Sequence, residues 1–286
     1  MPNVSPGPKR LIPVAGLVDT PVALVAQQDP EAAGRLAASA GEIAAGRTVS
    51  RRVAAGLALG TAAAATAALA ADAFAQDGGA ANLPGAIVDV LNFALTLEEL
   101  EAEFYTRGVG SPTLFGSDYP QAVFDQIRKH EVAHVALLRQ TLGGRAIPKP
   151  TFDFTAGGQF ADVFSNPQTF AALAQAFEDT GVRAYKGQAA VLMPRPAVLT
   201  TALRIHSVEA RHASEVRRLR RQKGWVTGGT RGDLPAAAER TYEGEGNTFQ
   251  FILAQPVHNR GGATEAWDEP LTKGQVLAAV RPFVRS

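Results

Sequence analysis

Residues 205–219 (IHSVEARHASEVRRL) decide the fold class expected for this chain. Residues three or four apart lie on one face of an α-helix, so Glu209 and His212 point in the same direction. The other positions of that face are apolar, and they are Val198, Ala202, Ile205, Val216 and Leu219. A carboxylate and an imidazole directed at a core are costly unless another group pairs with them. The stretch therefore predicts a helix with an inward Glu-x-x-His pair, for which a metal ion is one candidate partner.

The same pattern occurs once earlier in the chain. Glu131 and His134 lie three apart in the helix predicted over residues 124–142, and its inward face is completed by Phe124, Ile127 and Leu138. Two of the five histidines thus follow a glutamate by three positions on an otherwise apolar face. Two pairs on two helices are stronger evidence for a metal site than one pair. The other histidines are interpreted as flanking or solvated residues, and they are His130, His206 and His258.

The first predicted helix, residues 84–106, contains the run LEELEAEFY and begins at a proline, a favourable first-turn residue. Its inward stripe includes Glu98, Glu101 and Tyr105. The same period places Glu99 and Glu103 in solvent. This helix is therefore expected to direct Glu98, with Glu101 beside it, at the core.

The third predicted helix, residues 168–193, carries Glu178 and Tyr185 on its inward stripe, seven positions apart, as are Glu98 and Tyr105. The polar residues predicted to face solvent are Gln175, Asp179, Arg183 and Lys186. The chain thus contains two similar halves. Each half has one inward glutamate on its first helix and a Glu-x-x-His pair on its second.

These halves predict an all-α fold, an antiparallel four-helix bundle over residues 84–223. Short loops within each half favour antiparallel neighbours, and the long connection at residues 145–167 suits a crossover between the second and third helices. Residues 224–286 are expected to be a C-terminal extension that packs on the bundle or on a partner subunit. It includes an amphipathic helix over residues 272–284, whose buried side is predicted to be Val276, Leu277, Val280, Phe283 and Val284.

The N-terminal part of the chain is not expected to belong to the bundle. Residues 1–47 are rich in Ala, Pro and Gly and are predicted to be a disordered extension. Residues 48–75 consist of an arginine pair, an uncharged apolar run and an Ala-x-Ala site, which is the order of an export signal. The residues that mark this signal are Arg51, Arg52, Ala73 and Ala75. The pair resembles the twin-arginine type, so we expect cleavage and a periplasmic or extracellular protein without a stable membrane anchor. An alanine-rich surface helix is the alternative.

The composition excludes several function classes. The 286 residues carry a formal net charge of +1, so no broad basic surface for nucleic acid is expected. The chain has no cysteine, which excludes thiol chemistry, disulfides and cysteine-ligated zinc. Carboxylates and imidazoles remain as the residues able to hold a metal ion.

The motifs as a set resemble the ferritin-like superfamily, in which two helices each supply a glutamate and two others a Glu-x-x-His pair. The phrases LNFALTLEELEAEFY, FEDTGVRAYKGQA and EPLTKGQVLAAVRPF are more narrowly similar to its desiccation-related members from plants and bacteria. The resemblance covers about residues 84–286. It implies terminal metal ligands at Glu98 and Glu178, bridging ligands at Glu131 and Glu209, one ligand per ion at His134 and His212, and supporting positions at Tyr105 and Tyr185. Glu101 is left open as a ligand or a structural acid.

The cofactor implied by the resemblance is a pair of Fe or Mn ions, because carboxylate oxygens with one imidazole per ion suit these metals. Such a centre would serve a dimetal oxidoreductase that oxidises iron, like a ferroxidase, or removes peroxide, like a catalase. The alternative is a non-catalytic, stress-related structural protein whose buried Glu and His residues satisfy one another by hydrogen bonds. Either function is compatible with a homo-oligomer.

Overall fold

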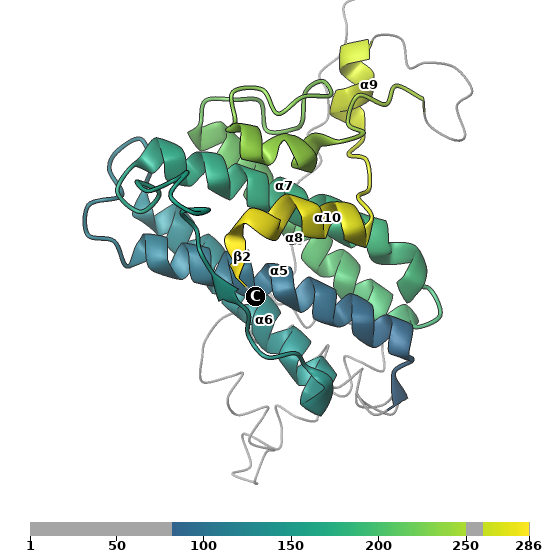
Figure 1. Ribbon diagram of the computed structural model, residues 1–286. Coiled ribbons are helices and arrows are strands. Elements are labelled where there is room, and N and C mark those ends of the chain that lie inside the picture. Colours follow the sequence, from purple (N-terminus) through teal and green to yellow (C-terminus); the bar gives the residue numbers. More distant parts are fainter. Residues whose placement is uncertain (1–81, 250–259, 286) are drawn as a thin grey trace, which may run out of the picture. The chain divides into compact units, whose positions relative to one another are not determined.

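Four long helices form the bundle that the apolar periodicity predicts (Figure 1). The computed structural model describes residues 82–249 and 260–285. The bundle helices are α5 (Gly85–Val109), α6 (Gln121–Leu142), α7 (Pro167–Leu192) and α8 (Pro196–Leu219). Helix α5 packs most extensively on α6, α7 packs most extensively on α8, and α5 also contacts α7. The predicted all-α bundle is confirmed.

Some expectations fall on other parts of the chain. The extension predicted for residues 1–47, the export signal predicted for residues 48–75 and His258 lie outside the described residues. Within the part of the chain that the structure describes, no helix has both the length and the apolar character that crossing a membrane requires.

The helix boundaries follow from local chemistry. The Asn166 side chain caps α7 by accepting hydrogen bonds from the backbone N–H groups two and three positions later. Pro196 occupies the first turn of α8, where its missing N–H group costs nothing. Thr272 and Gln275 form a reciprocal capping box at the start of α10 (Lys273–Val280). Each of these helices therefore begins where the sequence supplies a cap or a proline.

The crossover between α6 and α7 passes through η2 (Gly143–Arg145) and β1 (Thr151–Phe152). Strand β1 pairs antiparallel with β2 (Val284–Arg285), which joins the crossover to the C-terminal end of the described chain. The buried aromatic residues of the crossover are Phe152, Phe154 and Phe160, and they belong to the main apolar cluster. The crossover is therefore part of the core.

Apolar side chains form one layer on each side of the middle of the bundle, along the helix axes. In α6, Phe124 and Ile127 belong to one apolar cluster and Leu137 and Leu138 to a second, and the Glu-x-x-His pair lies between them. In α8 the order along the chain is the opposite: residues of the second cluster precede the Glu-x-x-His pair and a residue of the first cluster follows it. The polar residues at mid-bundle are thus shielded from solvent by apolar layers.

The described C-terminal extension consists of η3 (Ala236–Tyr242), α9 (Arg260–Ala266), α10 and η4 (Arg281–Phe283). The single helix predicted for residues 272–284 is wrong, because α10 ends at Val280 and η4 and β2 follow it. Leu277 is 40% exposed, contrary to its predicted burial. The short helix turns only a narrow face toward α7 and η3, which it contacts.

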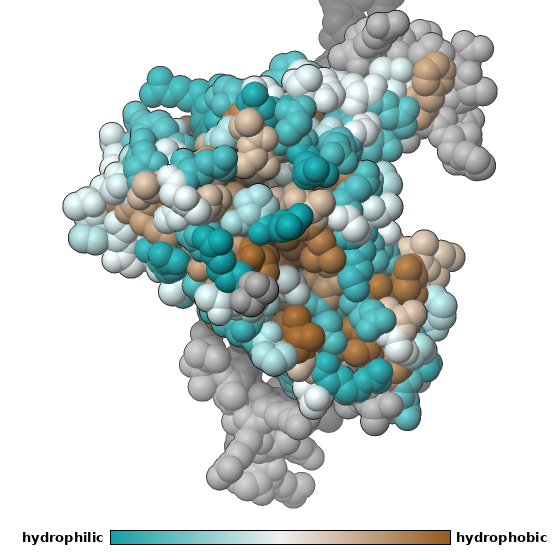
Figure 2. All heavy atoms as spheres, in the orientation of Figure 1, coloured by the Kyte–Doolittle hydropathy of each residue, from teal (hydrophilic) through white to brown (hydrophobic). Residues whose placement is uncertain are grey.

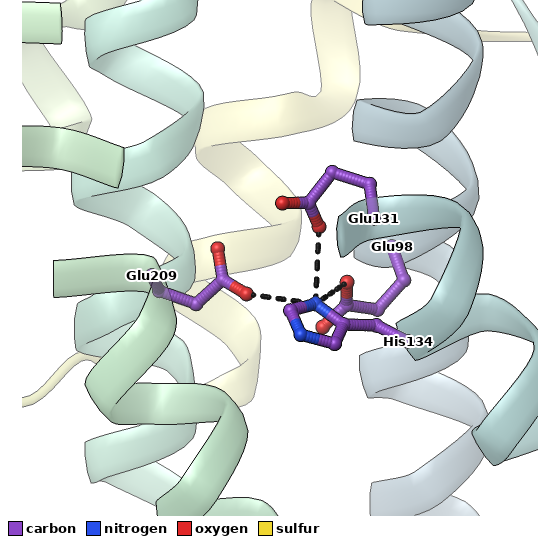
Figure 3. Close-up of side chains that lie close together, drawn as sticks. All are labelled: Glu98, Glu131, His134 and Glu209. Carbon is purple, nitrogen blue, oxygen red and sulfur yellow. Dashed lines mark hydrogen bonds and ion pairs between the residues drawn. The ribbon is translucent and has the colours of Figure 1, made fainter. Parts of the chain in front are cut away.

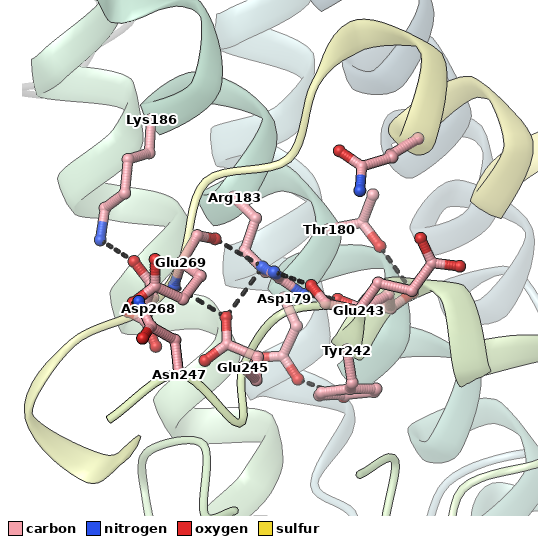
Figure 4. Close-up of polar contacts among 12 residues, drawn as sticks. Asp179, Thr180, Arg183, Lys186, Tyr242, Glu243, Glu245, Asn247, Asp268 and Glu269 are labelled. Atoms are coloured by element: carbon pink, nitrogen blue, oxygen red, sulfur yellow. Dashed lines mark hydrogen bonds and ion pairs between the residues drawn. The ribbon is translucent and has the colours of Figure 1, made fainter. Parts of the chain in front are cut away.

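The outward face of α7 is the main correction to the predicted fold. The helical period predicts Gln175, Asp179 and Arg183 to face solvent, yet they are at most 4% exposed. The extension covers this face and supplies polar partners (Figure 4). Helical periodicity separates polar from apolar positions, but it does not report that residues far along the chain will cover the polar face.

Arg183 is the centre of these contacts. Its guanidinium donates to the backbone carbonyls of Thr241, Glu243 and Glu269, and the Glu245 carboxylate lies 2.8 Å from its Nε. Burial lowers the pKa of Arg183, and Glu245 opposes this shift. One buried side chain of α7 thus holds two segments of the extension, residues 241–245 and Glu269.

The surface of the described residues mixes hydrophilic and apolar side chains. Figure 2 shows hydrophilic residues over much of the visible face and apolar residues in small groups near its centre. The exposed large apolar side chains are Val132, Val191, Met193, Leu203, Trp225, Phe249, Trp267 and Leu277.

Candidate metal centre

Every bundle helix contributes to one buried cluster of carboxylates and imidazoles. The contributors are Glu98 from α5, Glu131 and His134 from α6, Glu178 from α7, and Glu209 and His212 from α8. The four carboxylate residues are 0% exposed, and neither histidine exceeds 9%. The structure therefore brings together all six residues to which the family resemblance assigns metal ligation.

One half of the cluster is built around His134 (Figure 3). Its Nδ1 lies 3.1 Å from Glu98 Oε2, 3.3 Å from Glu131 Oε2 and 3.1 Å from Glu209 Oε1. Ligand atoms of these four residues all lie within 4.8 Å of one another. We call them the His134 group.

The other half is built around His212 in the same way. Its Nδ1 lies 2.8 Å from Glu131 Oε1, 3.2 Å from Glu178 Oε2 and 3.7 Å from Glu209 Oε2. These four residues are the His212 group, whose ligand atoms also lie within 4.8 Å of one another. Glu131 and Glu209 belong to both groups, and each directs one oxygen at each histidine. This is the arrangement that two carboxylates bridging a pair of ions would require.

Several atoms of the cluster lack the hydrogen bonds that buried polar atoms normally make. They are Glu131 Oε1, Glu178 Oε2, both carboxylate oxygens of Glu209, and His212 Nδ1. Each such atom costs about 1–3 kcal/mol when left unsatisfied. These atoms lie within ion-pairing distance of one another, but their geometry does not form hydrogen bonds. Their lone pairs therefore point into one shared space. The donor set of carboxylate oxygens and one imidazole per group fits Fe or Mn.

Two tyrosines form hydrogen bonds with Glu98 and Glu178, the carboxylates that each belong to a single group. The Tyr105 hydroxyl donates to Glu178 Oε1 over 2.5 Å, and the Tyr185 hydroxyl donates to Glu98 Oε1. Both tyrosines are buried. Each bond leaves the second oxygen of its carboxylate directed at a histidine, Glu178 Oε2 at His212 and Glu98 Oε2 at His134. The tyrosines thus orient the cluster without entering it.

The pKa shifts of the four carboxyl groups differ between the two that are shared by both groups and the two that belong to a single group. Burial raises the pKa of Glu98, and it raises that of Glu178 to about 8. Burial also acts on Glu131 and Glu209, but contacts with the two histidines outweigh it and lower the pKa of both carboxyls. The surroundings therefore favour the ionised form of the two shared carboxylates and the neutral form of the other two.

Glu101 lies beside the cluster but belongs to neither four-residue group. Burial raises its pKa well above the usual value, and repulsion from Glu209 and Glu178 adds to the effect. A Cβ on Gly181 of α7 would lie 3.4 Å from Glu101 Oε1 and 3.6 Å from Glu209 Oε2, which are ordinary contact distances. Burial and this repulsion thus favour the neutral form of Glu101 next to a shared carboxylate.

The predicted exposure of Glu99 is wrong. Glu99 is 5% exposed, because Arg139 of α6 donates to its carboxylate over 2.6 Å and Lys149 of the crossover lies 3.7 Å away. Glu103 is partly exposed and pairs with Lys149 at 2.8 Å. Both acids belong to a charged cluster at the bundle edge.

The sequence interpretation missed a role for His130. Its Nδ1 lies 2.8 Å from His212 Nε2, so it contacts the cluster from the side opposite the carboxylates. His206 is half-buried, and its Nδ1 lacks a hydrogen bond. The segment HEVAH places His130 four positions before His134 on a shared helix face. That spacing was the available signal, but it could not reveal that the partner would come from α8.

Comparison with known proteins agrees with this geometry. Residues 86–222 match a family model described as a ferritin-like domain. The match spans nearly the whole bundle and all six cluster residues. The curated proteins compared with the chain include no match. The family match supports the ferritin-like superfamily, and the all-α bundle with its buried Glu and His residues is consistent with that assignment.

Proposed function

We propose that the bundle holds a carboxylate-bridged pair of Fe or Mn ions, and that the protein uses it to oxidise and handle iron or to remove peroxide. One observation carries the proposal: Glu131 and Glu209 each divide their two oxygens between His134 and His212. Hydrogen bonding between isolated Glu and His pairs would not require this sharing. The ferritin-like match over residues 86–222 supports it.

The residues of the chain have distinct roles in this proposal. Glu131 and Glu209 would be shared by the two ions, and Glu98 and Glu178 would each bind one ion. His134 and His212 would provide one nitrogen ligand each. A redox metal pair supplies the electrons for reducing dioxygen or peroxide.

The surroundings of the cluster support the same chemistry. The apolar layers above and below it limit the access of water, which strengthens electrostatic interactions at the site. The raised pKa of Glu101 favours the neutral form of its carboxyl group beside Glu209. Glu101 is therefore the residue that we expect to hold a proton next to the site.

The alternative is a stress-related structural protein that retains the cluster without metal. The raised pKa values of His134 and His212 are compatible with it, since charged imidazoles would offset part of the buried negative charge. The two functions differ in metal content.

We also propose that residues 48–75 direct export, so that the mature protein acts outside the cytoplasm, alone or as a homo-oligomer.

Elemental analysis tests the proposal. The chain would be produced with Fe and with Mn in the medium and purified without an affinity metal. We expect about two equivalents of metal per chain. The Glu131→Ala, Glu209→Ala double variant should lose both, whereas Glu215→Ala, an exposed acid on α8, should keep them. A metal-free wild type that folds normally would support the structural alternative.

A further inference from the structure

His130 makes the two halves of the cluster unequal. Its Nδ1 lies 2.8 Å from His212 Nε2, and the two rings are 11° from parallel with their centroids 5.1 Å apart. Rings at this angle and separation meet edge to edge in one plane, as a hydrogen bond between imidazoles requires. The side-chain amide of Gln126 lies 2.8 Å from the other nitrogen of His130. His212 therefore stands at the end of a chain of hydrogen bonds that reaches the exposed Gln126.

Within the described residues, His134 has no equivalent support. Among residues 82–249 and 260–285, the polar contacts of its ring are those of Nδ1 with Glu98, Glu131 and Glu209, and its centroid lies 6.5 Å from that of His212. The sequence explains the difference. His130 immediately precedes Glu131 in the first Glu-x-x-His helix, whereas Val208 immediately precedes Glu209 in the second. A valine side chain has neither a donor nor an acceptor.

The direction of the hydrogen bonds follows from the carboxylates. His212 Nδ1 faces Glu131, Glu178 and Glu209, so an ion bound there takes the lone pair of Nδ1. The ring proton then resides on Nε2 and is donated to His130 Nδ1. His130 would then carry its proton on Nε2, and the Gln126 amide, whose nitrogen lies 2.8 Å from Nε2, would turn its oxygen to that place to accept the proton. This sequence of bonds selects one tautomer and one ring orientation of His212.

We propose that His130 is a positioning residue that makes the His212 group the tighter of two unequal metal positions. The inference rests on the proposed dimetal function and adds an order of filling to it. Partners behind a ligating histidine fix its orientation and raise its basicity, and their loss typically weakens metal binding about 10–100-fold. The His134 group lacks such a partner within the described residues, so it fills second and empties first.

The test is a cycle of variants titrated anaerobically with Mn²⁺ and followed by calorimetry, without turnover. His134→Ala leaves the His212 group as the binding position, and His212→Ala leaves the His134 group. We expect His130→Val to weaken Mn²⁺ binding about 10–100-fold in the His134→Ala chain. The same change should leave the Kd of the His212→Ala chain unaltered.

Two further variants separate positioning from folding. His130→Asn retains a polar atom close to the place of Nδ1, so it should restore most of the affinity that His130→Val loses. His206→Val removes another half-buried histidine that touches no cluster carboxylate, and it should not change the Kd. If a ligand-deleted chain does not fold, ¹⁵N spectra of the metal-free chain with both ligands intact provide a second readout. His130→Val should then shift the ¹⁵N resonance of His212 Nε2, the nitrogen that loses its partner.

The outcomes are distinguishable. An equal loss at both positions, an unchanged Kd in the His134→Ala chain or unaltered ¹⁵N shifts of His212 would overturn the inference while leaving a two-ion site intact. A wild type that binds neither Mn²⁺ nor Fe²⁺ would overturn the proposed function and the inference together. A selective loss in the His134→Ala chain that His130→Asn restores would support it.

Discussion

Glu209→Ala is the substitution from which we expect the largest loss of metal binding. Glu209 is 0% exposed and contributes one oxygen to each group, 3.1 Å from His134 Nδ1 and 3.7 Å from His212 Nδ1. Its loss leaves three of the four residues in each group. Both ions would lose a ligand at once, together with the negative charge that they share.

The magnitude can be worked from linkage. Metal at about 100 times its Kd stabilises the folded state by about 2.7 kcal/mol. For a domain of about 150–250 residues, each kcal/mol raises the melting temperature by about 2–4 °C. Wild type should therefore melt about 5–11 °C higher with metal than without it, whereas Glu209→Ala should show almost no shift.

Scanning calorimetry with and without Mn²⁺ checks this expectation. The metal-induced shift is compared within each variant, so the cavity left by the substitution cancels. Glu215→Ala is the matched control because Glu215 is an exposed acid on the same helix, and it should keep the full shift. Glu99→Ala is unsuitable, because Glu99 is buried and paired with Arg139. A full shift in Glu209→Ala, or none in wild type, would refute the reasoning.

Three other outcomes are expected. Burial raises the pKa of Glu178 from 4.5 to about 8, so the metal-free fold gains stability from that carboxyl below about pH 4.5 and loses it as the pH rises to about 8. Melting curves across that range should show the decline, and Glu178→Gln should flatten it. Arg183→Met should cost about 3–5 kcal/mol in urea unfolding, because it leaves Glu245 buried without its cation. For export, Arg51→Lys with Arg52→Lys should leave uncleaved precursor in the cytoplasm, as fractionation and mass spectrometry would report.

The sequence predicts the structure correctly where residues repeat with the period of an α-helix. Glu131, His134, Glu209 and His212 are fixed to one helix face by their spacing of three, and that face was otherwise apolar. Any bundle that buries those faces must bring the two pairs toward each other. The fold and the meeting of the two Glu-x-x-His pairs could therefore be predicted from local pattern alone, whereas the ligand roles of Glu98 and Glu178 rested on the family resemblance.

The sequence was uninformative where partners come from distant parts of the chain. Asp179 looks like a solvent-facing residue of α7, yet it is buried against Arg217 and Tyr242. Tyr242 lies in the extension, 63 positions later. Glu99 was misplaced for the same reason, since Arg139 is 40 positions away. Periodicity assigns a side chain to a face, but only the tertiary structure decides what covers that face.

The same long-range contacts connect the extension to the cluster through α7. Glu178 and Asp179 are adjacent, and both are buried, one toward His212 and the other toward the extension. Arg183, one turn later, holds two segments of the extension. A functional site requires its side chains to be held to within about 0.5 Å, so the position of Glu178 depends on a helix that is fixed from both sides. A change at Arg183 should therefore weaken metal binding as well as folding, although Arg183 contacts no residue of either group.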